Sequence, residues 1–390
     1  MTQLILMNAP QITPSRLKDE PLGIDTRRGQ IIASKQFGEV MSIDLAGYVI
    51  YPGLINAHDH LELNHFPRTK FREVYPNARE WSDDVSQRLN ASPYLELRTA
   101  PLADRCFIGG LKNLLSGATT VAQHNPLHPP LKKWNFPVRV VQKYGWAHSL
   151  YLSPANEIQW SYHKARRRVW MIHAAEGTDT IAAGEFSQLN KLGVIGPHTI
   201  LIHGVGLNES DTQSAIERGA SLVWCPSTND YLLGKTAAVQ EWIQVGRVAI
   251  GSDSRLTADG DLLDELRAAQ RTGQADAQNL FTMVTHNPRQ MLKLKDVGDL
   301  QVGMQADLIV LPHHDNPYQA LTEANRADLS LVIHKGQVMI GDPELVQRFP
   351  GKFERVVLDG REKLMAKSLV DRVRRCTLQE VGLQLGTISS

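Results

Sequence analysis

Two histidines one residue apart, His58 and His60, directly follow the apolar run Leu54-Ile55-Asn56-Ala57. On an extended strand, positions i and i+2 project to the same side, so two imidazoles there can hold one metal ion. Imidazole and carboxylate ligands suit zinc, iron, manganese or nickel. Taken alone, a His-x-His pair occurs often by chance and is equally typical of a polar loop. The pair therefore needs support from other residues.

Three further polar residues each follow an apolar run of their own. His173 follows residues 169–172, His203 follows residues 199–202, and Asp253 lies just after residues 248–252. The carboxyl ends of the strands in a parallel barrel converge on one face, where active sites lie. Side chains from separate strand ends would then point at one spot, and the pattern predicts a metal-dependent catalytic site.

Glu176 lies three residues after His173. At that distance a carboxyl group can lean over the metal without binding it, which suits a proton shuttle in hydrolysis. The alternative is an acid at a helix N-terminus, stabilised by the helix dipole. The two roles are compatible, so both stay open.

Short apolar runs that alternate with helical patterns position these residues. Continuous apolar runs are typical of strands buried on both faces. The alternation favours a (β/α)8-type barrel, also called a TIM barrel, with a doubly wound sheet as the alternative. Seven runs are found rather than eight, and residues 156–168 indicate a helix that leads straight into the run at 169. We therefore expect a barrel that is distorted or lacks its fourth strand. The seven runs are residues 54–57, 118–121, 138–141, 169–172, 199–202, 221–224 and 248–250.

The two ends of the chain have a different pattern, with short strands separated by turn residues. These patterns predict a small β-sandwich domain built from residues 1–50 and 300–345. Residues 51–299 would form the hydrolase barrel. Residues 346–390 are expected to be a C-terminal extension that is helical or partly mobile.

Composition narrows the function. The chain has 390 residues, with 42 Lys and Arg against 41 Asp and Glu, a net charge of +1. This balance gives no electrostatic reason to expect nucleic acid or an acidic membrane as a partner. The three cysteines, Cys106, Cys225 and Cys376, are far apart and predict neither a disulfide framework nor a cysteine zinc site. With no signal peptide or membrane span in the pattern, we expect a cytoplasmic protein with a small-molecule substrate, and we leave a homo-oligomer open.

Five segments together resemble the amidohydrolase superfamily. The resemblance runs from about residue 40 to residue 340 and extends to Gly298–Leu308, which is similar to the family's return to its small β domain. The segments are Pro52-Gly53-Leu54-Ile55-Asn56-Ala57-His58-Asp59-His60, His173-Ala174-Ala175-Glu176-Gly177, Leu201-Ile202-His203-Gly204, Cys225-Pro226-Ser227-Thr228-Asn229 and Gly251-Ser252-Asp253-Ser254.

The spacing His-x-x-Glu after the expected fifth strand resembles the branch with cytosine and guanine deaminases and triazine chlorohydrolases. That resemblance implies one divalent metal, zinc first and iron as the alternative. Its ligands would be His58, His60, His173 and Asp253. Glu176 and His203 would then act on water and substrate without binding the metal.

The implied reaction is hydrolytic deamination of a small nitrogen heterocycle by metal-activated water. Asp253 would accept the first proton, His203 would orient the attacking oxygen, and Glu176 would pass a proton to the neighbouring nitrogen or to the leaving group. Two alternatives remain: hydrolysis of an amide, cyclic amide or carbon–halogen bond at the same site, and an inactive scaffold that retains the fold.

Candidates for substrate binding follow from position alone. Two arginines near the motifs could bind an anionic group, although a surface salt bridge is the simpler interpretation for each. One histidine ends the second run, and two residues that follow the run at 221–224 could reach a ring. The five candidates are Arg68, Arg255, His124, Asn229 and Tyr231.

Overall fold

The computed structural model describes residues 3–14, 17–34 and 40–386. Its centre is a set of parallel strands that fall into two sheets, ordered β10-β9-β8 and β11-β12-β13-β14-β15. All seven apolar runs expected to be strands are strands, and β12 is buried along its whole length. The strands are β8 (Leu54–Asp59), β9 (Ala118–Gln123), β10 (Arg139–Val140), β11 (Tyr144–Trp146), β12 (Val169–Ala174), β13 (Thr199–His203), β14 (Ser221–Trp224) and β15 (Val248–Ile250).

The structure explains why a fourth strand could not be found in the sequence. Only three residues, 141–143, separate β10 from β11. β10 pairs in parallel with β9, and β11 pairs in parallel with β12. A return between parallel strands needs a crossover of about a dozen residues. We conclude that β10 and β11 form one extended segment, which we call the third pass, pairing first with one neighbour and then with the other.

The fold is thus an α/β arrangement of the barrel type with seven passes, and its strand pairing is not continuous around the described residues. Where the last strand meets the first, the backbone N–H of Asp253 donates to the carbonyl of His58 over 3.0 Å. This contact brings the ends of β15 and β8 side by side, which places two of the expected metal ligands next to each other.

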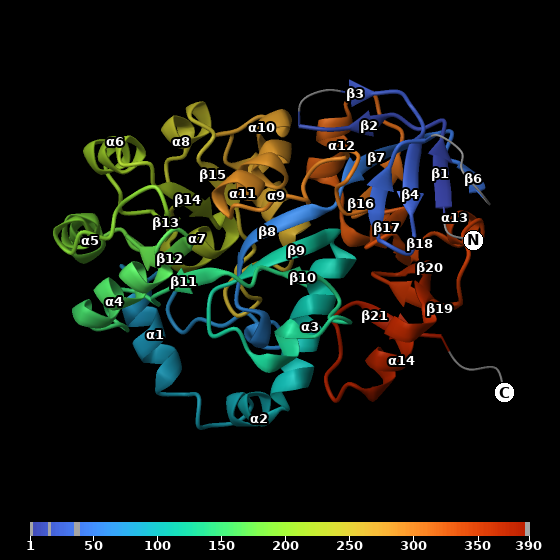
Figure 1. Ribbon diagram of the computed structural model, residues 1–390. Helices are drawn as coiled ribbons and strands as arrows, with labels where there is room; N and C mark the ends of the chain where they lie inside the picture. Colours follow the sequence, from blue (N-terminus) through green and yellow to red (C-terminus); the bar gives the residue numbers. More distant parts are fainter. Residues whose placement is uncertain (1–2, 15–16, 35–39, 387–390) are drawn as a thin grey trace.

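Helices cover the outside of these strands (Figure 1). The helix expected over residues 156–168 is α4, which ends slightly earlier at Ala165. The helices are α1 (Ala78–Ser86), α2 (Tyr94–Thr99), α3 (Leu102–Leu115), α4 (Ala155–Ala165), α5 (Thr180–Lys191), α6 (Glu209–Glu217), α7 (Pro226–Leu233), α8 (Gln240–Gln244), α9 (Leu262–Arg271), α10 (Ala277–Met283), α11 (His286–Met291), α12 (Pro317–Glu323), α13 (Pro343–Val346) and α14 (Lys367–Arg375), with 3-10 turns η1 (Leu61–Leu63), η2 (Pro129–Lys132) and η3 (Arg326–Asp328).

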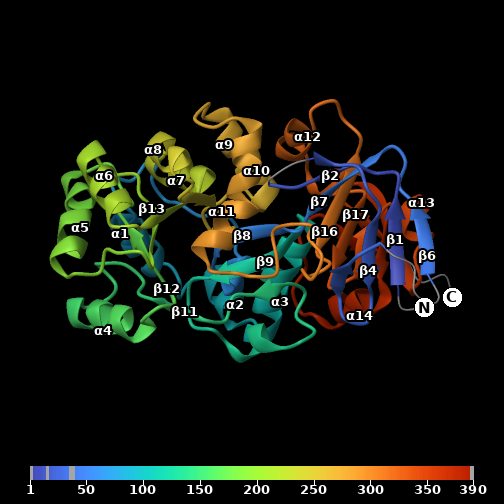
Figure 2. The same cartoon turned by 45° about the horizontal axis from the view of Figure 1, so that its top comes forward.

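The two chain ends build two further sheets, which lie together beside the parallel strands (Figure 2). One has the order β5-β4-β1-β6, with β5 (Gln30–Ile32), β4 (Leu22–Asp25), β1 (Gln3–Met7) and β6 (Val40–Asp44). The other has the order β21-β19-β20-β18-β17-β16-β7-β2-β3, with β21 (Leu383–Leu385), β19 (Phe353–Leu358), β20 (Arg361–Ala366), β18 (Gln337–Gly341), β17 (Leu331–His334), β16 (Leu308–Pro312), β7 (Tyr48–Pro52), β2 (Gln11–Ile12) and β3 (Leu17–Lys18).

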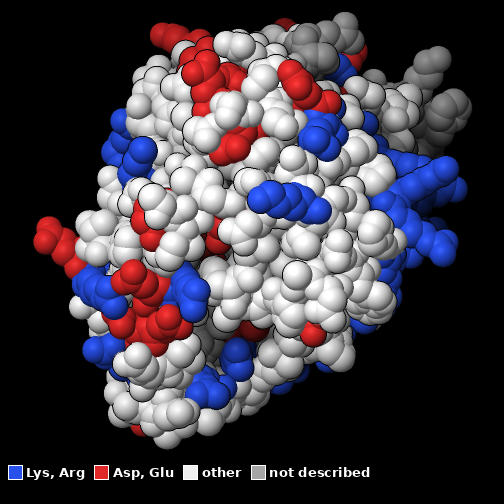
Figure 3. All heavy atoms as spheres, turned by 90° about the vertical axis from the view of Figure 1, so that its left-hand side faces the viewer, with Lys and Arg blue, Asp and Glu red and all other residues white. Residues whose placement is uncertain are grey.

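The last segment of the chain differs from expectation. Instead of being mainly helical, residues after 345 contribute β19, β20 and β21 to the larger sheet, with α14 packed against them. Acidic and basic side chains are interspersed over the face in Figure 3, as expected for a chain with almost equal numbers of both. Among the described residues, no helix has the length and apolar character needed to cross a lipid bilayer.

Candidate metal and active site

Four side chains from three separated parts of the chain meet at the carboxyl ends of the strands. His58 lies in β8 and His60 directly after it, His173 lies near the end of β12, and Asp253 follows β15. The Nε2 atom of His173 lies 3.4 Å from that of His58 and 3.3 Å from that of His60. Asp253 Oδ1 lies 3.7 Å from Nε2 of both His58 and His60.

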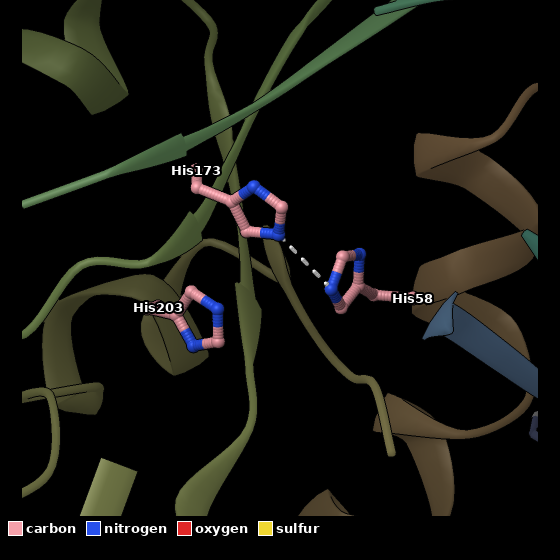
Figure 4. A group of neighbouring side chains, drawn as sticks. All are labelled: His58, His173 and His203. Atoms are coloured by element: carbon pink, nitrogen blue, oxygen red, sulfur yellow. Dashed lines mark hydrogen bonds between the residues drawn. The ribbon is translucent and has the colours of Figure 1, made fainter. Parts of the chain in front are cut away.

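These separations fit a tetrahedral metal site. With metal–ligand distances of about 2.0–2.1 Å, the corners of a tetrahedron lie roughly 3.4 Å apart. His58, His60 and Asp253 form one group that could hold a metal ion, and His58, His173 and His203 form another. Figure 4 shows the rings of the second group turned toward a common space, with the His173–His58 contact dashed. The four donors named above therefore suit one small divalent ion.

The protonation states of the rings agree with this use. Burial lowers the pKa of His58 to about 3, and burial together with the neighbouring imidazoles places the pKa of His173 well below its usual value. Both rings are therefore neutral near pH 7. The carbonyl of His148 accepts a hydrogen bond from His173 Nδ1 over 2.8 Å, so the lone pair of His173 lies on Nε2.

Asp253 is held ionised and oriented. Burial would raise its pKa, but the facing imidazoles of His58, His60 and His203 outweigh burial and hold the pKa well below its usual value. The hydroxyl of Thr257 donates to Oδ2 over 3.1 Å. That contact leaves Oδ1 facing the histidines. The backbone of Asp253 adopts a left-handed conformation with φ of 50°, which surrounding contacts must support.

A carboxyl group and an imidazole stand beside the four donors. Glu176 Oε1 lies 3.4 Å from His203 Nε2. Burial raises the pKa of Glu176 well above its usual value, with further contributions from Asp253 and Glu185. Glu176 therefore retains a proton under conditions where an exposed glutamate would lose it. His203 donates from Nδ1 to Asn229 Oδ1 over 2.9 Å, so its Nε2 is free to accept.

A buried ion pair ties the two ligand-bearing segments together. Lys112 on α3 is fully buried, and its Nζ lies 3.0 Å from Asp59 Oδ2, between the two histidines of β8. The same ammonium group donates to the carbonyl of Asp253 over 3.1 Å and to Ser252 Oγ over 3.0 Å. Asn113 and Asn64 also donate to the Asp59 carboxylate, over 2.6 and 2.8 Å. This network fixes the end of β15 relative to β8.

The substrate candidates have varied surroundings. Arg255 makes a double hydrogen bond to the buried Glu380, over 2.9 and 2.6 Å, so its guanidinium belongs to an internal ion pair rather than to a surface salt bridge. Arg68 pairs with Asp259 and stacks on the ring of Tyr231 at 3.8 Å. Both arginines thus have partners within the chain.

Two other candidates contact the histidines themselves. Asn229 lies on α7 and binds His203. His124 is fully buried, stacks on His173 with ring centres 4.2 Å apart, and has its Nε2 2.9 Å from the carbonyl of Ala147. Its Nδ1 has no partner within the described residues. Their positions favour orientation of the histidines over direct contact with a substrate.

A cavity of about 120 Å³ lies beside His173 and Glu176. Tyr151 and Leu150, which follow the third pass, form part of its wall, and Glu185 of α5 forms another part. Glu185 accepts a hydrogen bond from the backbone of Ala175, over 2.6 Å. None of these three was predicted from the sequence. His148, which contacts His173, was missed as well, although it follows β11 as the other histidines follow their strands.

Comparisons with known proteins find a family model and several deaminases among similar sequences. Residues 155–339 match the model of the Amidohydrolase family. The 5-methylthioadenosine/S-adenosylhomocysteine deaminase of Pelotomaculum thermopropionicum is 26% identical over 358 residues, covering 77% of this chain and 82% of the relative. The protein of the same name from Halobacterium salinarum is 25% identical over 389 residues, covering 82% of this chain and 90% of the relative.

Solved structures share the fold. An adenosine deaminase from Xanthomonas campestris with bound zinc has a TM-score of 0.73 at 17% identity, covering 95% of this chain and 97% of its own. The atrazine chlorohydrolase of Arthrobacter aurescens complexed with zinc has a TM-score of 0.71 at 18% identity, covering 86% and 95%. Residues 155–339 therefore match the Amidohydrolase family, and these solved structures share the fold of most of the chain.

Proposed function

We propose that this chain is a metal-dependent hydrolase that removes an amino group from a small nitrogen heterocycle. One observation carries the proposal. His173 Nε2 lies 3.3–3.4 Å from those of His60 and His58, and Asp253 Oδ1 lies 3.7 Å from Nε2 of both of these rings. Beside them stands Glu176, whose pKa burial raises well above its usual value. Metal ligands beside a proton donor are the parts that hydrolysis of a carbon–nitrogen bond requires.

The proposed cofactor is one divalent ion, zinc first and iron as the alternative. Three imidazoles and a carboxylate form a ligand set that zinc accepts. The ring of His173 is already oriented by a carbonyl behind it, a common arrangement for metal-binding histidines. When bound, the ion would lower the pKa of a water molecule toward neutrality.

Three residues of the chain have separate roles in moving protons and orienting water. Asp253, ionised and itself one of the four proposed ligands, accepts a proton from the attacking water. His203, neutral at Nε2 because Asn229 fixes its tautomer, orients that water. A carbon–oxygen bond forms at the ring carbon, and Glu176 donates its proton to the neighbouring nitrogen. Asp253 then passes the proton it accepted to the amino group, the carbon–nitrogen bond breaks and ammonia leaves. The proton from Glu176 stays on the ring nitrogen, and the new hydroxyl group returns a proton to Glu176 as it becomes a carbonyl.

The relatives' names guide the choice of substrate. Besides the two deaminases above, the 5'-deoxyadenosine deaminase of Methanothermobacter thermautotrophicus is 28% identical over 175 residues, covering 40% of this chain and 41% of the relative. We therefore propose an aminated purine or a related ring as the first substrate to test. Hydrolysis of an amide, cyclic amide or carbon–halogen bond, and an inactive scaffold, are the alternatives that the test must separate.

The test measures ammonia release from aminated purines, pyrimidines, pterins and triazines, with protein stripped of metal and reloaded with zinc or iron. We expect release only from reloaded protein. Glu176→Gln should retain metal and lose about 10²- to 10⁴-fold in rate, whereas the exposed Glu217→Gln should keep its activity. Release of halide or of a carboxylate without ammonia would indicate hydrolysis of a carbon–halogen or amide bond instead of deamination. Stripped protein that takes up no metal would favour the inactive scaffold.

Several expectations from the sequence stay predictions. We propose that residues 1–50 with 300–345 act as a small β domain around a barrel of residues 51–299, with 346–390 as an extension. We also retain a cytoplasmic location and leave a homo-oligomer open. The direct roles of Arg68, His124 and Tyr231 in substrate binding await the same substrate panel.

A further inference from the structure

A second cleft, of about 620 Å³, lies away from the histidine cluster. Its wall includes Arg139 at the start of the third pass and Val169 at the start of β12. His173 lies four residues further along β12, about 13 Å away at the usual rise of a strand. The cleft therefore opens near the amino ends of the strands, whereas the proposed active site lies at the carboxyl ends.

The cleft follows from the shortened barrel. Because residues 141–143 connect β10 directly to β11, no crossover helix lies over the third pass in the described structure. The lining of the cleft includes the apolar residues Val138, Val141 and Val169, which are themselves almost fully buried. The apolar floor is thus a property of this chain's unusual connection.

Eight basic residues surround that floor. Six come from the turn before the third pass, from the pass itself and from the residues before β12: Lys132, Lys133, Arg139, Lys143, Arg167 and Arg168. Lys293 and Lys335 complete the set. The single acidic residue in the lining, Asp296, is engaged by Gln305, whose Nε2 donates to it over 3.0 Å.

None of the eight cations forms an ion pair within 4.0 Å in the part of the chain that the structure describes, although many ion pairs occur elsewhere. Lys335 and Lys293 donate to the backbone carbonyls of Trp134 and Arg167, which carry no countercharge. The Nε atom of Arg139 is buried without a partner among the described residues. The charge of Asp307 acts on Arg139 and Lys335. With Asp296 that makes two acids against eight cations, a concentrated excess of positive charge in a chain whose net charge is only +1.

We propose that this cleft binds a small polyanion of the nucleotide class, with its phosphates on the cationic rim and its ring on the apolar floor. Guanidinium groups match phosphate oxygens in two-pronged hydrogen bonds. The volume lies within the range of small-molecule sites. Trp134, 87% exposed at the rim, offers a face on which a ring can stack.

The test is calorimetric binding to the full chain, with ATP, tripolyphosphate and adenosine as probes. We expect one equivalent of ATP to bind, tripolyphosphate to bind more weakly, and salt to weaken both. The Arg139→Gln/Arg168→Gln variant should bind ATP with an affinity at least about tenfold lower. Arg218→Gln, which removes an exposed cation outside the cleft, is the matched control and should bind as the unchanged protein does.

The variants also separate this site from the histidine cluster, where a polyphosphate could bind a metal. ATP binding that Arg139→Gln/Arg168→Gln leaves unchanged would overturn the proposal, as would no binding at millimolar ATP. Tighter binding of single-stranded RNA than of ATP, or a dimer that these substitutions dissociate, would assign the cleft to a different partner. Because Arg139 is partly buried, Arg168→Gln alone provides a second variant at an exposed position.

Discussion

Among single residues, His173 is the one whose removal should affect the proposed metal site most cleanly. Its Nε2 lies within 3.4 Å of both other ring donors, and a carbonyl already orients it. We expect His173→Ala to fall well below one equivalent of metal after dialysis, measured by elemental analysis. His163→Ala, an exposed histidine on α4, should retain the full amount. A full equivalent in His173→Ala would remove it from the ligand set.

Asn229 acts through His203, and its replacement should slow turnover without releasing metal. The side-chain oxygen of Asn229 accepts the Nδ1 proton of His203 and thereby fixes the tautomer. We expect Asn229→Leu to lower kcat about 10- to 100-fold. Asn229→Asp keeps the acceptor but adds a charge that raises the pKa of His203, so its pH–rate profile should shift upward. Unchanged kcat and pH profile in both variants would contradict this positioning role.

The residues that bind or surround the cluster were predictable where a long apolar run preceded them. His58, His60, His173, His203 and Asp253 all follow such runs, so their convergence could be anticipated. His148 follows a strand of only three residues that includes a glycine, and nothing in its neighbourhood marks it. The partner of Arg255 could not be found because Glu380 lies 125 residues away.

At the scale of elements, the sequence indicated that a strand was missing, but it did not indicate how the remaining strands pair without it. The third pass is one extended segment that pairs with β9 through β10 and with β12 through β11. Pairing with two different strands cannot be inferred from the local sequence pattern. The strands after residue 345 were missed for another reason. β19 and β20 carry many charged residues because they lie near the edge of their sheet, which obscures the alternation of apolar and polar positions.

The link between α3, β8 and β15 gives a prediction about elements. Removing one partner of a buried ion pair leaves an uncompensated charge, which typically costs about 3–5 kcal/mol. We therefore expect Lys112→Met to lower the free energy of unfolding in urea by that amount, because Asp59 stays buried without it. Adding Asp59→Asn should recover part of the loss, since no charge is then left unpaired. Losses that simply add in the double variant would show that the two groups act independently.

At the scale of the whole molecule, burial raises the pKa of several carboxyl groups. Glu265 is the one that best tests how such burial affects the free energy of unfolding. It lies on α9, fully buried, and accepts hydrogen bonds from the backbone and hydroxyl of Ser227. Burial raises its pKa from 4.5 to about 8 in spite of those bonds. The folded protein therefore binds one proton more than the unfolded chain between these two values.

This difference sets the sign of a pH effect on global stability. Stability that is present below pH 4.5 is lost as the pH rises toward 8, by at most about 1.4 kcal/mol per pH unit. Glutamine does not ionise and can still accept from Ser227, so Glu265→Gln should lack this loss. We expect its free energy of unfolding, measured in urea on metal-loaded protein, to gain on that of the unchanged protein steadily between pH 5 and 8. Parallel curves would mean that Glu265 ionises as easily in the fold as in water, so burial at the base of α9 would carry no cost.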